Sequence, residues 1–265
     1  MLMRGNFFKG LVLLLTIAMG VTVVFAEARG VKKKRALPHE YGNVVMNNLS
    51  DKNNIAPVVF NHWLHRGLYT CRLCHVDLAF AMQANGTAVK EDDNRKGFYC
   101  GACHNEHEAF GWVGKNKEGV EVKKCDRCHS YGKKVVFEKD FYKFTADLPH
   151  ERFGNGIDWE RAENDGKLKL KDYLEGISIK RKPLAIPPDT QVKAQVSDMP
   201  DIVFSHKKHA VWSGCELCHP DIFGVKKGSS VYSMEEIFSG KYCGLCHDKV
   251  AFPNIDCQRC HTKAV

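Results

Sequence analysis

Residues 58–65 read Val58-Val59-Phe60-Asn61-His62-Trp63-Leu64-His65, and Cys71-Arg72-Leu73-Cys74-His75 follows them. A second stretch repeats the pattern as Ile202-Val203-Phe204-Ser205-His206-Lys207-Lys208-His209, followed by Cys215-Glu216-Leu217-Cys218-His219. In both copies the first histidine precedes the first cysteine by nine residues. Residues three apart share one face of a helix. Each copy therefore places two imidazoles side by side, just ahead of a cysteine pair.

All cysteines of the chain fall in pairs of the form Cys-x-x-Cys-His. The twelve cysteines are Cys71/Cys74, Cys100/Cys103, Cys125/Cys128, Cys215/Cys218, Cys243/Cys246 and Cys257/Cys260, followed by His75, His104, His129, His219, His247 and His261. Two cysteines at this spacing form thioethers with the two vinyl groups of one porphyrin, and the adjacent histidine lies beneath the iron. Zinc sites and disulfides are the alternatives, but both leave the six histidines unexplained. The pattern predicts six covalently bound c-type haems.

The first 26 residues are typical of an export signal. Arg4 and Lys9 precede an apolar run from Leu11 to Phe25, and cleavage fits after either Ala26 or Ala28. The alternative is an uncleaved anchor. It would place the strongly basic side, residues 29–35, in the cytoplasm and the haem motifs with it. We therefore expect a cleaved, exported protein of the bacterial cell envelope, periplasmic or extracellular, without a membrane span after cleavage.

Composition adds little about partners. With 44% hydrophobic and 26% charged residues, the chain fits neither a disordered nor a multi-span membrane protein. The formal net charge of +8 is a weak guide, because each haem brings two propionates. We interpret the basic run from Lys32 to Arg35 as a solvated tail and expect no nucleic-acid partner.

Self-comparison divides the chain into halves. Residues 97–104 match residues 240–247, and each half carries three motifs in the same order. This predicts two tandem triheme units, residues 27–145 and 146–265, after the signal 1–26. Upstream, residues 37–43 resemble 148–155, and each copy carries a histidine. The second unit holds an insertion, residues 157–200, for which we expect a linker with room for one short strand; a partner-docking loop is the alternative.

The histidine count bears on the chemistry. The six motif histidines leave His39, His62, His65, His107, His150, His206 and His209 as candidates for the second axial position of six irons. We expect the pairs His62/His65 and His206/His209 to be ligands, and His39 and His150 to serve the third haem of each unit. His107 has no counterpart in the other half, where Val250 lies opposite it, so we interpret it as solvated, with ligation as the alternative.

These residues bring out a family likeness. Phe-x-His-x-x-His ahead of three haem motifs resembles the triheme class III cytochromes c of the c-seven type, here in tandem, over residues 58–130 and 202–262. The resemblance implies that the first histidine of each pair ligates the first haem and the second histidine the second haem. The family's further distal histidine usually lies between the first and second motifs. No histidine lies between His75 and Cys100 or between His219 and Cys243.

The expected fold is a multihaem cytochrome c of mostly loops and short helices wrapped around the haems, with little strand. Six haems leave too little polypeptide for an ordinary core around each. The expected function is electron transfer through closely spaced bis-histidine haems in anaerobic respiration, without catalytic residues. The resemblance implies a membrane quinol-oxidising complex and an outer-membrane or terminal acceptor as partners; the oligomeric state stays open. The alternatives are a multihaem reductase with one open haem and a subunit of an extracellular haem filament.

Overall fold

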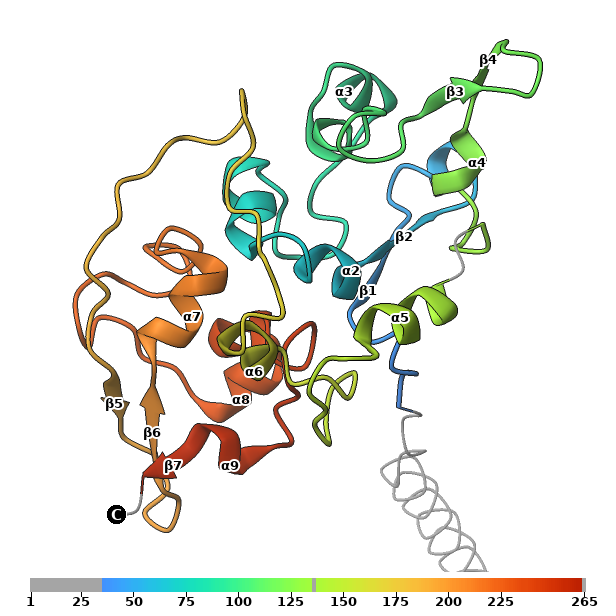
Figure 1. Ribbon diagram of the computed structural model, residues 1–265. Helices are drawn as coiled ribbons and strands as arrows, with labels where there is room; N and C mark the ends of the chain where they lie inside the picture. Colours follow the sequence, from blue (N-terminus) through green and yellow to red (C-terminus); the bar gives the residue numbers. More distant parts are fainter. Residues whose placement is uncertain (1–34, 135–136, 264–265) are drawn as a thin grey trace, which may run out of the picture. The chain divides into compact units, whose positions relative to one another are not determined.

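The computed structural model describes residues 35–134 and 137–263, which lie almost wholly within the compact unit that begins at Leu37. The expected export signal, residues 1–26, lies outside the described residues. In the described ranges no helix is long and apolar enough to cross a bilayer. The elements are short throughout, and loops join them (Figure 1).

The first half begins with a strand pair that carries a histidine helix. Strands β1 (Asn43–Met46) and β2 (Val58–Asn61) are antiparallel, and α2 (His62–Arg66) follows β2 directly. The remaining elements are η1 (Asp51–Asn53), η2 (Leu73–Asp77), α3 (Glu91–Arg95), η3 (Tyr99–Ala102), the hairpin β3 (Val113–Lys115) and β4 (Glu121–Lys123), α4 (Cys125–Cys128) and α5 (Phe137–Thr145).

The second half repeats this order. Strands β5 (Thr190–Val192) and β6 (Asp201–Phe204) pair, and α7 (His206–Ser213), α8 (Met234–Phe238), η4 (Tyr242–Leu245) and α9 (Cys257–Cys260) follow. The last strand, β7 (His261–Lys263), joins β6 on its other edge, so that β6 is central (Figure 1). The repeated order supports the division into two triheme units, which stays a prediction. In the described residues the strands are three or four residues long and form two two-stranded sheets and one three-stranded sheet. A paired strand leads into each histidine helix.

Sequence explains where the histidine helices begin. Asn61 caps α2: its backbone is extended and its side chain accepts a hydrogen bond from the Leu64 amide at 3.2 Å. Ser205 takes the same place before α7 with extended backbone, but without a side-chain cap bond. Each cap residue thus ends the strand and begins the helix, so both histidines of a pair lie in the first turn of the helix.

A close approach of backbone fixes the second motif of each half. Gly101 lies in η3 against the carbonyl oxygen of Asn94, and Gly244 lies in η4 against the carbonyl oxygen of Ile237. A Cβ at either glycine would overlap that oxygen. The glycine inside these two motifs is therefore needed for the preceding helix, α3 or α8, to pack on the motif.

A cluster of buried apolar side chains is shared by both halves. It consists of Trp63, Phe141, Leu148, Ile157, Trp159, Ala162, Leu168 and Trp212. Residues 157–200, for which we expected a linker, supply four of these side chains and two elements, α6 (Trp159–Asn164) and β5. Trp159 and Ala162 lie three apart on one face of α6, which buries them together. The insertion is thus packed into the molecule.

Candidate haem-binding sites

Each cysteine pair lies in about one turn of helix. The amide of the motif histidine donates to the carbonyl of the first cysteine four residues earlier, at 2.8 Å for His104 and Cys100 and at 3.0 Å for His247 and Cys243. Residues spaced by three and four share a helix face, so both sulfurs and the imidazole point to one side. None of the twelve cysteines, which all lie within the described residues, forms a disulfide. This is the donor set that two thioethers and one proximal ligand require.

Three ring pairs have the spacing of two imidazoles on one metal ion. The ring centroids are 6.4 Å apart for His62 and His75, with planes 8° from parallel. They are 6.4 Å apart for His65 and His104 and 6.3 Å apart for His209 and His247. Metal–nitrogen bonds of about 2 Å on opposite sides of one ion place ring centres roughly 6 Å apart. The residues fit axial coordination, in the pairing that the resemblance implies. His206 has no motif histidine at this spacing among the described residues.

The ring orientation is also that of ligands. Eleven of the thirteen histidines have Nδ1 within hydrogen-bond distance of a backbone carbonyl oxygen; they are His62, His65, His75, His104, His129, His150, His206, His209, His219, His247 and His261. A carbonyl only accepts, so Nδ1 carries the proton and Nε2 keeps its lone pair. Nε2 is then the atom available to iron.

His39 and His107 do not follow this rule. The side chain of His107 is 89% exposed, and its Nδ1 lies 3.8 Å from the Glu108 carboxylate. This exposure favours the solvated interpretation of His107. His39 is different, because its Nδ1 is enclosed without a hydrogen-bond partner. His150 stands beside the last motif, since the adjacent Glu151 pairs with Arg259.

Phenylalanines hold the ligand rings in both halves. Phe60 packs against His65 with ring centroids 4.4 Å apart, and Phe204 packs against His209 at 4.3 Å. Both also contact the first histidine of their pair edge-on. This explains the phenylalanine in the repeated sequence pattern: it fixes both imidazoles of the pair in orientation.

Burial keeps the buried imidazoles neutral. It lowers the pKa of His62 to about 4, against the hydrogen bond to the Gly42 carbonyl, which raises it. Burial likewise lowers the pKa of His247 to about 4, opposed by the bond to the Phe252 carbonyl. Neutral imidazole is the form that binds a metal.

One continuous cavity reaches cysteines of all six pairs. Apolar side chains such as Leu184, Val225 and Val231 line it, and all three are exposed on the protein surface. Apolar walls with convergent thiols and imidazoles suit a porphyrin, which is largely apolar. The chain's residues therefore fit covalently bound haem.

The thiols of different pairs lie near one another. Burial, then the thiols of Cys71, Cys103 and Cys100, raise the pKa of Cys74 to about 12. Burial and the Cys128 thiol raise the pKa of Cys100 to about 11. The three attachment sites of the first half are thus electrostatic neighbours in the order of the chain.

The same effect crosses between the halves. Burial, then the thiols of Cys71 and Cys218, raise the pKa of Cys246 to about 12. Burial and the Cys260 thiol raise the pKa of Cys243 to about 11. The first attachment site of the first half is therefore an electrostatic neighbour of the first two sites of the second half.

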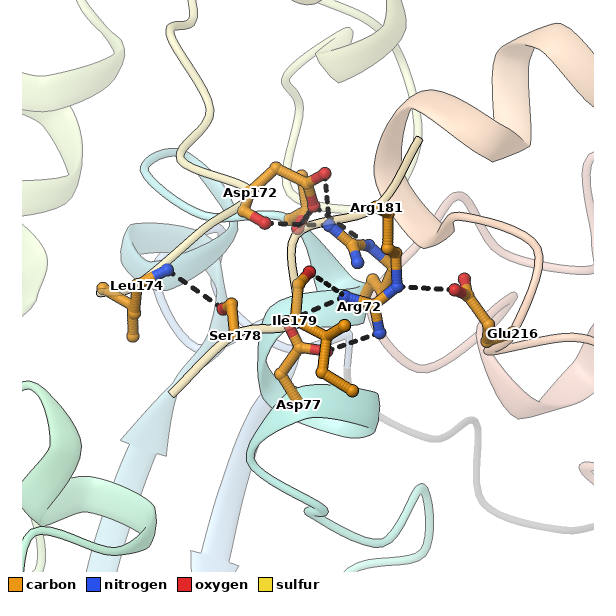
Figure 2. A network of polar contacts seen from close by, with 9 residues as sticks. Arg72, Asp77, Asp172, Leu174, Ser178, Ile179, Arg181 and Glu216 are labelled. Atoms are coloured by element: carbon orange, nitrogen blue, oxygen red, sulfur yellow. Dashed lines mark hydrogen bonds and ion pairs between the residues drawn. The ribbon is translucent and has the colours of Figure 1, made fainter. Parts of the chain in front are cut away.

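A polar cluster clamps the two equivalent first motifs, as Figure 2 shows. Arg181, from the insertion, lies 2.7 Å from Asp77 and 2.6 Å from Glu216. Asp77 follows the first motif of the first half, and Glu216 lies inside the first motif of the second half. The Asp77 side chain is only 2% exposed. Arg181 therefore joins both halves through one guanidinium.

A second contact of the same cluster involves the first motif itself. Arg72, between Cys71 and Cys74, forms an ion pair with Asp172, and Thr70 donates to the same carboxylate at 2.6 Å. Sequence reasoning missed these residues. Asp172 lies in the unmatched insertion, and pairs about a hundred residues apart leave no periodic signal.

The chain matches known haem proteins. A family model described as cytochrome c7 and related cytochrome c matches residues 58–130 and 202–262, half of the chain. The solved C-terminal hexaheme fragment of GSU1996 is 25% identical, with 83% of this chain and 97% of that chain covered and a TM-score of 0.27. Its N-terminal hexaheme fragment is 23% identical, with 84% and 99% covered and a TM-score of 0.25. No curated protein matches this chain by sequence.

Proposed function

Because the chain belongs to the family of cytochrome c7 and related cytochromes c, we propose that it is an exported carrier of electrons with six bis-histidine haems. The family consists of electron-transfer proteins and not of enzymes. The six Cys-x-x-Cys-His motifs bind haem c covalently. The observation that carries the bis-histidine proposal is the spacing of 6.3 to 6.4 Å between paired imidazoles.

The proposed ligand set pairs a motif histidine with a distal one at each haem. His62 shares a haem with His75, His65 with His104, and His209 with His247. By analogy with His62, His206 shares a haem with His219. For the third haem of each unit, we assign His39 and His150 opposite His129 and His261. The Glu151–Arg259 ion pair beside His150 supports the assignment in the second half.

Bound haem supplies reversible one-electron oxidation and reduction. The chain holds the two imidazoles of each pair through carbonyl acceptors and phenylalanine contacts. Histidine as both ligands favours low reduction potentials, because methionine ligation raises them. Imidazoles at both axial positions also leave the iron without an open position for substrate.

The neighbouring thiols suggest an order of sites for the electron path. From Cys128 the neighbours run through Cys100 and Cys74 to Cys71, and from there to Cys246 and Cys218 of the second half. Cys260 adjoins Cys243 at the other end. The third haem of each unit would then be the entry or exit of a continuous path through both halves.

The proposed setting is anaerobic respiration in the bacterial cell envelope, periplasmic or extracellular. Support comes from the signal-like residues 1–26 and from the low potentials that histidine ligation favours. Partners are redox proteins: a membrane quinol-oxidising complex on one side and an outer-membrane or terminal acceptor on the other.

The decisive experiment is a haem count with optical and EPR spectra of the ferric protein, purified from the exported fraction. We expect six haems, all low-spin, with spectra that do not change when nitrite or carbon monoxide is added. A high-spin haem that binds either ligand would contradict the ligand set and favour a reductase. A spectrum that depends on protein concentration would indicate ligation between subunits, as in a filament.

A further inference from the structure

A partly buried arginine stands between the two halves. Arg66 is the last residue of α2 and follows the ligand candidate His65. Its guanidinium carbon lies 4.8 Å from the ring centre of Trp159 and 5.1 Å from that of Trp212. Trp159 belongs to the insertion, and Trp212 belongs to α7 of the second half. The guanidinium is therefore held between two indole rings, one from each element.

The charge of Arg66 is not neutralised by these contacts. Its Nη1 donates to the backbone carbonyl of Val250, and its Nε is enclosed without a hydrogen-bond partner. Indole faces and a carbonyl attract a cation but carry no net charge. A partly buried cation keeps a stronger field than an exposed one, because less water screens it.

Two haem attachment sites lie within that field. Cys71 packs against the apolar cluster that contains Trp159 and Trp212, the two rings that contact the guanidinium. Val250, whose carbonyl accepts from Arg66, donates its amide to the Cys246 carbonyl at 2.9 Å. Cys71 belongs to the first attachment site of the first half, and Cys246 belongs to the second site of the second half. Arg66 also lines the cavity that these sites share.

We propose that Arg66 is a positioning residue for electron transfer between the halves: its positive charge raises the reduction potentials of the two haems attached at Cys71/Cys74 and Cys243/Cys246. The reduced haem carries one positive charge less at iron, so a nearby cation stabilises reduction. The added electron then rests at the junction of the two triheme units. The proposal builds on the proposed function, since it takes electron transfer through six haems as given.

The test is a potentiometric titration of the purified hexahaem protein, followed by visible absorption and by EPR. Arg66→Gln removes the charge, and Arg66→Met fills the space between the indoles with a neutral chain. In both variants we expect two of the six midpoints to fall. A tenfold change in the reduction equilibrium corresponds to about 59 mV for one electron, and we expect a fall of this order. Arg66→Lys should keep both midpoints.

The matched control is Arg95→Gln. The Arg95 guanidinium lies 4.8 Å from the Trp112 ring, as Arg66 does from Trp159, but its side chain is 49% exposed. Solvent screens a charge in that position, so all six midpoints should stay within error. A fall in Arg95→Gln equal to that in Arg66→Gln would overturn the proposal.

Other outcomes are equally clear. Unchanged midpoints in an Arg66→Gln protein with six haems would overturn the proposal. So would a fall in Arg66→Lys as large as in Arg66→Gln, since the charge would then not be the cause. If neither neutral variant takes up six haems, Arg66 is a structural residue of the core, and the proposal fails. A high-spin haem in the unmodified protein would instead refute the ligand set of the proposed function.

Discussion

At the scale of single residues, eleven of the twelve ligand candidates share a hydrogen bond from Nδ1 to a backbone carbonyl; His39 and the solvated His107 lack it. His62 donates to the Gly42 carbonyl at 2.7 Å, whereas His107 is exposed beside a carboxylate. We expect His62→Met to raise the midpoint of one haem, because a methionine ligand raises the potential. His107→Met, the matched control, should leave all midpoints unchanged. The measurement is a potentiometric titration, and a shift in the control alone would refute the assignment.

Tyr41 predicts an alkaline loss of stability. Burial, with the Asp248 carboxylate adding to it and Arg66 opposing it, raises the pKa of Tyr41 to about 12. The unfolded chain releases this proton near pH 10. The stability that neutral Tyr41 contributes is therefore complete below about pH 10 and falls as pH rises toward 12. The loss is about 1 kcal/mol once solvent screening of this partly exposed ring is allowed for.

The comparison variant is Tyr41→Phe. It also loses the hydrogen bond to the Ala251 carbonyl, so its stability is lower at every pH. Its unfolding midpoint in guanidinium chloride should nevertheless fall less between pH 9.5 and pH 11.5 than that of the unmodified protein. Equal slopes in the two proteins would show that Tyr41 does not cause the loss.

At the scale of elements, the packing of α3 on η3 depends on the missing side chain of Gly101. Gly101→Ala would push a methyl group into the Asn94 carbonyl oxygen. We expect a loss of about 1–3 kcal/mol in the free energy of unfolding, typical of an overpacked site. Gly166→Ala is the control, because Gly166 also lies in a turn but has φ +69 and open space around it. Denaturant unfolding of both variants compares the cost of steric overlap at Gly101 with that of backbone strain at Gly166. A smaller loss of unfolding free energy in Gly101→Ala than in Gly166→Ala would contradict the prediction.

The helices and strands also show which parts of the fold could be predicted from the sequence. The histidine helices, the motif turns and their order in both halves follow from local patterns, and the structure has them. The pairing of β1 with β2 and the packing of α6 were not predicted. They depend on contacts between residues apart in the sequence, such as Val44 with Phe60 for the strands and Arg66 with Trp159 for α6. The family model confirms the haem family, whereas the ligand of each third haem stays a prediction.

At the scale of the whole molecule, the polar clamp holds the halves at their first motifs. Asp77→Asn removes one carboxylate partner of Arg181 from an ion pair that is buried on the Asp77 side, and Glu216 remains as the other carboxylate partner. We expect a loss of about 2–4 kcal/mol in the free energy of unfolding, because breaking a buried pair by one partner is costly. The denaturation midpoint in guanidinium chloride measures it.

The surface pair Lys96–Asp92 provides the control for the clamp. Its atoms are 2.6 Å apart, close to the Arg181–Asp77 distance, but the side chains are 62% and 69% exposed. Asp92→Asn should cost less than about 1 kcal/mol. An equal effect in the two variants would show that burial of Asp77 adds nothing to the clamp.

Three of the four tryptophans gather around the junction of the halves: Trp63, Trp159 and Trp212. The fourth, Trp112, lies apart with Arg95. Indole emission is quenched by energy transfer to nearby haem, so the native protein should be almost dark under ultraviolet excitation. The fluorescence that grows during denaturation is then mainly that of the junction. Tryptophan fluorescence therefore reports directly when the two halves of the molecule separate.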